Sequence, residues 1–173
     1  MKDLVMQLSA LSGVSSWEDE VRDFLRAEAA PYTQDIRTDA LGNLIVLKKG
    51  KKTAGNKLLL CAHMDEVGLM VRHITDEGYL KFDTVGSIDR RVLLGKPVLI
   101  GTARLPGVIG LKAYHLVSRG EEKQVPKLDD YYIDIGARNR EEAEKLVSLG
   151  DVADFTTQPE LFGHGLLKGK ALD

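Results

Sequence analysis

The residue types best suited to chemistry lie at positions 61–68, directly after an apolar run. Residues two apart in an extended segment point to the same side, so His63 and Asp65 should sit together. The carboxylate can then hold one imidazole nitrogen while the other binds a metal ion, as metal-ligating histidines usually show. The spacing is therefore compatible with a metal ligand at His63, oriented by Asp65. Glu66 points the other way and receives no role.

A His-x-Asp tripeptide also occurs by chance, and then its histidine is a satisfied residue at the end of a strand. The remaining reactive side chains favour structural interpretations. Cys61 is expected to be a small core residue, and His115 a packing or subunit-contact residue. Surface or loop positions are expected for His73, His164 and the pair Asp129-Asp130.

The elements before residue 68 read as the beginning of an α/β domain. Helices are predicted over residues 4–11 and from Ser15 or Ser16 to Pro31, and a strand over 44–47. The apolar run 57–62 predicts a strand buried on both faces of a sheet. Sites in such sheets gather at the carboxyl ends of strands, which is where His63 falls.

The pattern changes after residue 68. Short strand-like runs separated by glycine turns cover 71–74, 79–82, 98–103, 108–111 and 131–135. Closely spaced short strands of this kind are typical of a small antiparallel barrel or sandwich. A helix is predicted from Arg140 to Leu149, and the glycine-rich residues 163–169 read as a connection. The fold class predicted is α/β with an inserted β-rich, barrel-like domain, divided as 1–67, 68–160 and 161–173.

Composition excludes several classes of partner. The formal net charge is -2, from 24 basic and 26 acidic residues, which favours neither nucleic acid nor an anionic membrane. No apolar run approaches the length of a membrane span, and polar residues interrupt the N-terminal apolar stretch, which argues against a secretory signal. The single cysteine fits a reducing compartment, so a cytoplasmic location is expected.

Several segments together resemble one known family, the tetrahedral aminopeptidases. These metallopeptidases include glutamyl and deblocking aminopeptidases, and some carry an endoglucanase label. The resemblance rests on the histidine segment and on residues 11–15 with Glu18, 39–44, 85–89, 106–110, 115–116, 132–137 and 170–173. Ser87 stands where the family usually has a second glycine. The resemblance implies a split, phosphorylase/hydrolase-like metallopeptidase domain interrupted by the inserted domain.

The resemblance also implies roles for individual residues. His63 binds one metal ion, Asp65 orients that histidine, and Asp173 bridges two divalent ions such as zinc, cobalt or manganese. The substrates are peptides, and the inserted domain builds homo-oligomers. The family's remaining ligands follow Asp173 in the chain, so this sequence is expected to be an incomplete N-terminal half. With two ligands it should hold metal weakly and be inactive.

Two alternatives come from other functional classes. The short chain could act as a non-catalytic assembly or interaction module built on the inserted domain. It could also be a glycoside hydrolase, although that chemistry needs two carboxylates flanking a sugar cleft and no such pair stands out.

Overall fold

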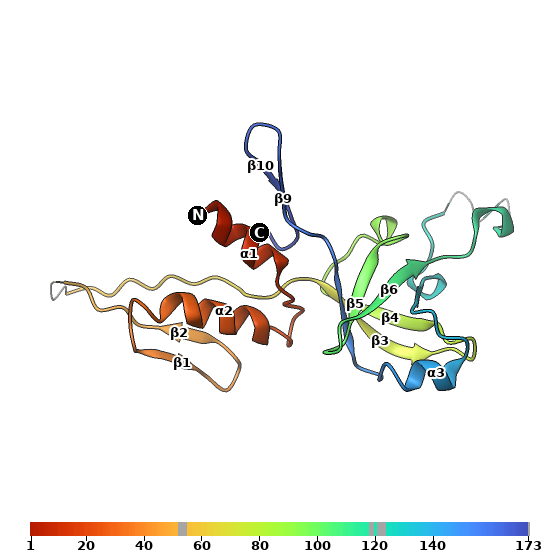
Figure 1. Cartoon of the computed structure of the whole chain (residues 1–173), viewed down its shortest axis with the longest axis horizontal. Helices are drawn as coiled ribbons and strands as arrows, with labels where there is room; N and C mark the ends of the chain where they lie inside the picture. Colours follow the sequence, from red (N-terminus) through yellow and green to blue (C-terminus); the bar gives the residue numbers. More distant parts are fainter. Residues whose placement is uncertain (52–54, 118–119, 121–123, 173) are drawn as a thin grey trace.

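The computed structural model describes residues 1–51, 55–117, 120 and 124–172. The helices are α1 (Lys2–Ala10), α2 (Asp19–Ala29) and α3 (Arg140–Glu144), with short 3-10 helices η1 (Arg90–Val92), η2 (Tyr114–Leu116) and η4 (Leu128–Asp130). The strands are β1 (Ile36–Thr38), β2 (Leu44–Val46), β3 (Gly68–Ile74), β4 (Leu80–Val85), β5 (Pro97–Ile100), β6 (Leu105–Gly110), β7 (Tyr132–Asp134), β8 (Val152–Phe155), β9 (Glu160–Phe162) and β10 (Leu166–Lys168). Figure 1 shows the barrel strands on one side, and α1, α2 and the β1–β2 hairpin on the other.

Six strands close into an antiparallel barrel in the order β3-β4-β7-β6-β5-β8. Residues 69–72 of β3 and 80–83 of β4 alternate between buried and more exposed, as a sheet with one covered face requires, and a bulge between Val71 and His73 interrupts the alternation in β3. Two glycines of β6 allow close approach: a Cβ at Gly107 would lie 2.6 Å from Ile133, and one at Gly110 would lie 2.5 Å from the Tyr132 ring. The predicted β-rich barrel is confirmed.

The hydrophobic core lies inside the barrel. Its buried members all fall between Leu69 and Ala153 and include Phe82, Ile109 and Ile133. Burying one such side chain stabilises the fold by roughly 1.5–3 kcal/mol. Among the described residues before β3, the buried apolar side chains are Val14 and Val21. The barrel therefore carries a core of its own, whereas the N-terminal elements bury little.

The N-terminal elements largely follow their sequence signals. Asp39 accepts hydrogen bonds from the backbone N–H groups of Leu41 and Asn43, both at 3.0 Å, and closes the predicted turn between β1 and β2. Helix α2 begins at Asp19, later than predicted. Ser15 does not cap the helix because its hydroxyl bonds a distant residue, Asp65.

The prediction for residues 57–62 was wrong. Leu58, Leu59 and Leu60 are 85%, 86% and 83% exposed, and Cys61 is exposed as well, so it is not a core residue. An apolar segment becomes a buried strand only when other strands flank it, and no strand of the described chain pairs with this one.

Strands β1 and β8 and the β9–β10 hairpin were not predicted; the hairpin occupies most of the expected connection. Helix α3 ends at Glu144, short of the predicted Leu149. Within the described ranges, no helix is long and apolar enough to cross a bilayer.

Candidate functional site

The segment before β3 is held against the loop between α1 and α2. Val14 and Glu66 form an isolated parallel bridge, and the Glu66 N–H donates to the Gly13 carbonyl at 2.7 Å. A Cβ at Gly68 would lie 2.5 Å from a Val14 methyl, so glycine permits this close packing. These contacts fix the backbone on which His63 lies.

His63 and Asp65 lie together. The His63 Nδ1 atom is 3.0 Å from Asp65 Oδ1, and the Ser15 hydroxyl donates to Asp65 Oδ2. The Ser15 hydrogen bond, followed by the contact with His63, holds the pKa of the Asp65 carboxyl below its usual range. The ionised carboxylate favours the tautomer that donates from Nδ1, which leaves Nε2 as the nitrogen able to bind a metal ion.

His63 and Asp65 line a cavity of about 270 Å³. The wall also includes Ala171 and the neighbours of His63 in the segment before β3, Ala62, Met64 and Glu66. The helices α1 and α2 and the loop between them contribute Leu8, Leu11, Gly13, Val21 and Leu25. Ala171 brings the end of the described chain to the histidine, although Asp173 itself lies outside the described residues.

One imidazole held by a carboxylate fits the donor chemistry of zinc, cobalt or manganese. Across the part of the chain that the structure describes, no three His, Cys, Asp or Glu side chains gather as a metal cluster. The described residues thus offer one imidazole, that of His63, with the chemistry of a metal ligand.

The sequence reasoning missed the buried ion pair between Glu66 and Lys170, whose side chains are 7% and 10% exposed. Burial raises the pKa of the Glu66 carboxyl, and Lys170 offsets part of that rise. The alternation of side chains pointed Glu66 away from His63, and an acidic side chain directed inward needs a cation. The sequence could therefore have indicated that Glu66 needs a cationic partner. It could not have indicated which one, because Lys170 lies far away in sequence.

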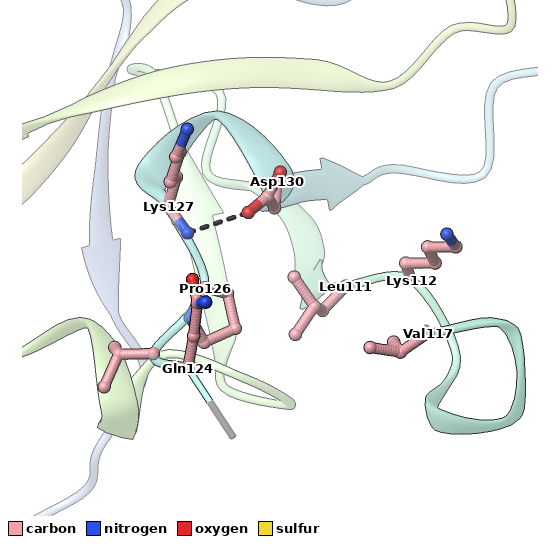
Figure 2. A pocket seen from close by; sticks show the side chains of 8 residues that line it. Leu111, Lys112, Val117, Gln124, Pro126, Lys127 and Asp130 are labelled. Atoms are coloured by element: carbon pink, nitrogen blue, oxygen red, sulfur yellow. Dashed lines mark hydrogen bonds between the residues drawn. The ribbon is translucent and has the colours of Figure 1, made fainter. Parts of the chain in front are cut away.

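A second cavity, of about 340 Å³, lies away from this site (Figure 2). It is lined by Leu111, Lys112, Val117, Gln124, Val125, Pro126, Lys127 and Asp130. Asp130 accepts a hydrogen bond from the Lys127 backbone N–H at 2.7 Å, which ties it to the η4 turn. Asp129 pairs with Arg72 of β3, so both aspartates have structural partners. His73, His115 and His164 are exposed.

Comparison with known proteins identifies a family. The family model described as M42 glutamyl aminopeptidase matches residues 42–173. An aminopeptidase-family protein of Acetivibrio thermocellus is 41% identical over 173 residues, covering 100% of this chain and 49% of the relative. The resemblance to aminopeptidases that the sequence motifs indicated is confirmed.

Solved structures agree. The aminopeptidase APDkam598 of the archaeon Desulfurococcus kamchatkensis superposes with a TM-score of 0.89 at 34% identity, over 99% of this chain and 47% of that one. The TET1 peptidase of Pyrococcus horikoshii, which can assemble into a tetrahedron or a large octahedral shell, gives a TM-score of 0.82 at 38% identity, over 96% and 50% of the two chains. The present chain thus spans about half the length of the relatives it matches.

Proposed function

Because the chain belongs to the M42 glutamyl aminopeptidase family, we propose that it forms part of a metal-dependent aminopeptidase that releases N-terminal residues from peptides. The observation that carries the proposal is the hydrogen-bonded pair of His63 and Asp65 on the cavity shared with Ala171. This pair has the chemistry of a metal ligand and its orienting carboxylate. The family and its aminopeptidase members support the substrate class, and the single cysteine supports a cytoplasmic location.

In this proposal His63 and Asp173 would hold the divalent ions, His63 through Nε2 and Asp173 as the carboxylate shared between two ions, and Asp65 keeps the imidazole in one tautomer. Bound there, two such ions lower the pKa of water and polarise the scissile carbonyl. Ser15 holds the second oxygen of Asp65 and so restrains the carboxylate. Catalytic zinc sites usually have three protein ligands. We therefore propose that this chain alone binds zinc, cobalt or manganese weakly and is inactive.

The proposed domain division is 1–67 and 161–173 for a split, hydrolase-like metallopeptidase domain, with 68–160 as an inserted barrel. The barrel strands run from Gly68 to Phe155, which supports those limits. The exposed run Leu58–Leu60 supports a sheet completed by protein beyond this chain, since apolar strands of that kind are normally covered.

A chimera tests the enzyme proposal. This chain would replace the matching half of the Acetivibrio thermocellus relative, and release of N-terminal residues from peptides would be measured with and without a chelator. We expect activity that chelation removes and added zinc, cobalt or manganese restores. His63→Ala should lower the activity by more than the roughly 10–100-fold that loss of an orienting partner of a metal ligand costs. Activity that survives chelation would contradict the proposal.

A second candidate function is a non-catalytic assembly module. It is favoured by the closed barrel, whose core lies within residues 69–153 and needs no side chain of the N-terminal elements. Size-exclusion chromatography with light scattering on the 173-residue chain, run with a peptidase assay, tests the module through its oligomeric state, because the aminopeptidase proposal also expects this chain alone to be inactive. A defined but inactive oligomer would support the module. Metal-dependent cleavage by this chain would contradict both the module and the proposed lack of ligands.

A further inference from the structure

A cluster of four charged side chains, of which Glu66, Lys170 and Asp154 are buried and Arg104 is partly exposed, joins distant parts of the chain. The Lys170 ammonium donates to Glu66 Oε1 and to the Leu11 carbonyl oxygen, and it lies 4.0 Å from Asp154 Oδ2. The other Asp154 oxygen accepts a hydrogen bond from Arg104 at 2.7 Å. The side chains of Glu66, Lys170 and Asp154 are at most 10% exposed, so they depend on one another for charge compensation.

Backbone contacts complete the cluster. The Gly13 N–H donates to Glu66 Oε1 at 3.2 Å, and the Ser9 hydroxyl donates to the Lys170 carbonyl oxygen at 2.6 Å. The two cations balance the two carboxylates. A buried cluster with this degree of pairing holds its segments in one arrangement, because any displacement leaves a charge without a partner.

The position of the cluster relates it to the candidate site. Glu66 follows Asp65 directly, and Lys170 precedes Ala171, which lines the cavity with His63. We propose that the Glu66–Lys170 ion pair is a latch that holds residues 62–66 against residues 170–172, so that His63 and Ala171 line one cavity. The link to a metal site rests on the proposed function.

Glu66 and Lys170 are positioning residues in this proposal, because they act through the segments that they join. Asp154 lies on β8, and Arg104 directly precedes β6, so the latch is also anchored to the barrel. The barrel thereby restrains both segments of the site.

Hydrogen exchange on the 173-residue chain tests the latch without any metal. Lys170→Met should speed exchange at least tenfold in two segments: in residues 62–66, at the Glu66 amide that donates to the Gly13 carbonyl, and in the loop after α1, at the Gly13 amide that donates to Glu66 Oε1. Barrel amides such as Ile109 should change less than about twofold. The matched control is Lys168→Met, because Lys168 pairs with Glu160 at 3.1 Å in an exposed position with side chains 53% and 62% accessible. It should leave both segments unchanged.

Two further variants keep the test decisive. Lys170→Arg retains the charge and should restore most of the protection. Glu66→Gln retains the shape and removes one charge, so it should loosen the same two segments if Lys170→Met does not fold. Faster exchange in only one segment, or an equal increase throughout the barrel, would overturn the latch.

Metal dependence in the chimera tests the positioning role. The cobalt concentration for half-maximal activity should rise at least tenfold in Lys170→Met, return toward the original value in Lys170→Arg, and stay unchanged in Lys168→Met. If the chimera is active and its cobalt concentration for half-maximal activity is the same with Lys170→Met as without it, the positioning role is overturned. The proposed function would still stand. A chimera without metal-dependent activity would count against the proposed function, and the exchange result would still decide the latch.

Discussion

Replacing Arg104 with methionine should destabilise the protein because it removes the hydrogen-bonded partner of a buried carboxylate. Asp154 is 3% exposed, and its Oδ1 atom accepts from Arg104 at 2.7 Å. Its Oδ2 atom has no hydrogen-bond partner among the described residues, and Lys170 lies 4.0 Å away. Methionine preserves much of the apolar stem of arginine, so the substitution mainly removes the charge.

The magnitude follows from the exposure of the two partners. Removing one member of a fully buried ion pair costs about 3–5 kcal/mol. The Arg104 side chain is 41% exposed, so solvent screens part of the interaction, and Lys170 remains near the carboxylate. We therefore expect a loss of roughly 2–3 kcal/mol in the free energy of unfolding. At roughly 2–4 °C per kcal/mol for a chain of this size, Tm should fall by about 4–12 °C.

Thermal and urea unfolding, followed by circular dichroism, measure this effect. Arg104→Lys keeps the charge and should lose less than half as much stability. The double variant with Asp154→Asn should be less destabilised than the sum of the single changes, because the two residues are coupled. A Tm of Arg104→Met within about 1 °C of the original protein, or additive losses in the double variant, would refute the reasoning.

Three further outcomes are expected. In the chimera, Asp65→Asn should weaken metal binding about 10–100-fold, measured by metal titration, because a neutral amide no longer holds the imidazole of His63 as firmly. Burial raises the pKa of Glu66 above the unfolded value of 4.5. Between the unfolded and folded pKa values, the folded state therefore binds more protons than the unfolded state. The contribution of Glu66 to stability therefore falls as pH rises above 4.5, and urea unfolding of Glu66→Gln should show a flatter pH dependence. Leu59→Lys should reduce aggregation, measured by light scattering, and change the unfolding free energy by less than about 0.5 kcal/mol, because the side chain is 86% exposed.

Each of these outcomes has its own control. Asp65→Glu retains a carboxylate and should bind metal more tightly than Asp65→Asn; equal affinities would contradict the orienting role. If Glu66→Gln leaves the pH dependence of the unfolding free energy unchanged, that dependence arises from other titratable groups. A large loss of stability in Leu59→Lys would contradict the exposed position of that side chain.

Local patterns in the sequence predicted much of the barrel and little of its surroundings. Glycine turns between short apolar runs indicated most of the barrel strands, because turn geometry and alternation are local properties. The run at 57–62 has the composition of a buried strand, yet its side chains are exposed. Burial of a strand depends on neighbours that a local pattern does not contain.

In the candidate site, too, the sequence predicted contacts between residues close in the chain and missed contacts between distant ones. The His63–Asp65 contact lies two residues apart and could be expected from strand geometry. Ser15 read as a helix cap, but its hydroxyl bonds Asp65 instead, which is a tertiary contact. The Glu66–Lys170 pair spans most of the chain, so no local spacing rule could have paired the two residues. The roles of His63, Asp65 and Asp173 in metal binding stay predictions.

The ring closure of the barrel limits how copies of this protein can meet. A closed ring of strands leaves no free edge to recruit another chain by backbone hydrogen bonding. Contacts made through the barrel must then be made by side chains, such as the exposed Leu94, Val108 and Leu149. Such contacts can be strengthened or abolished by single substitutions while the strand register stays the same. Assembly and folding of this part of the protein can therefore be altered independently.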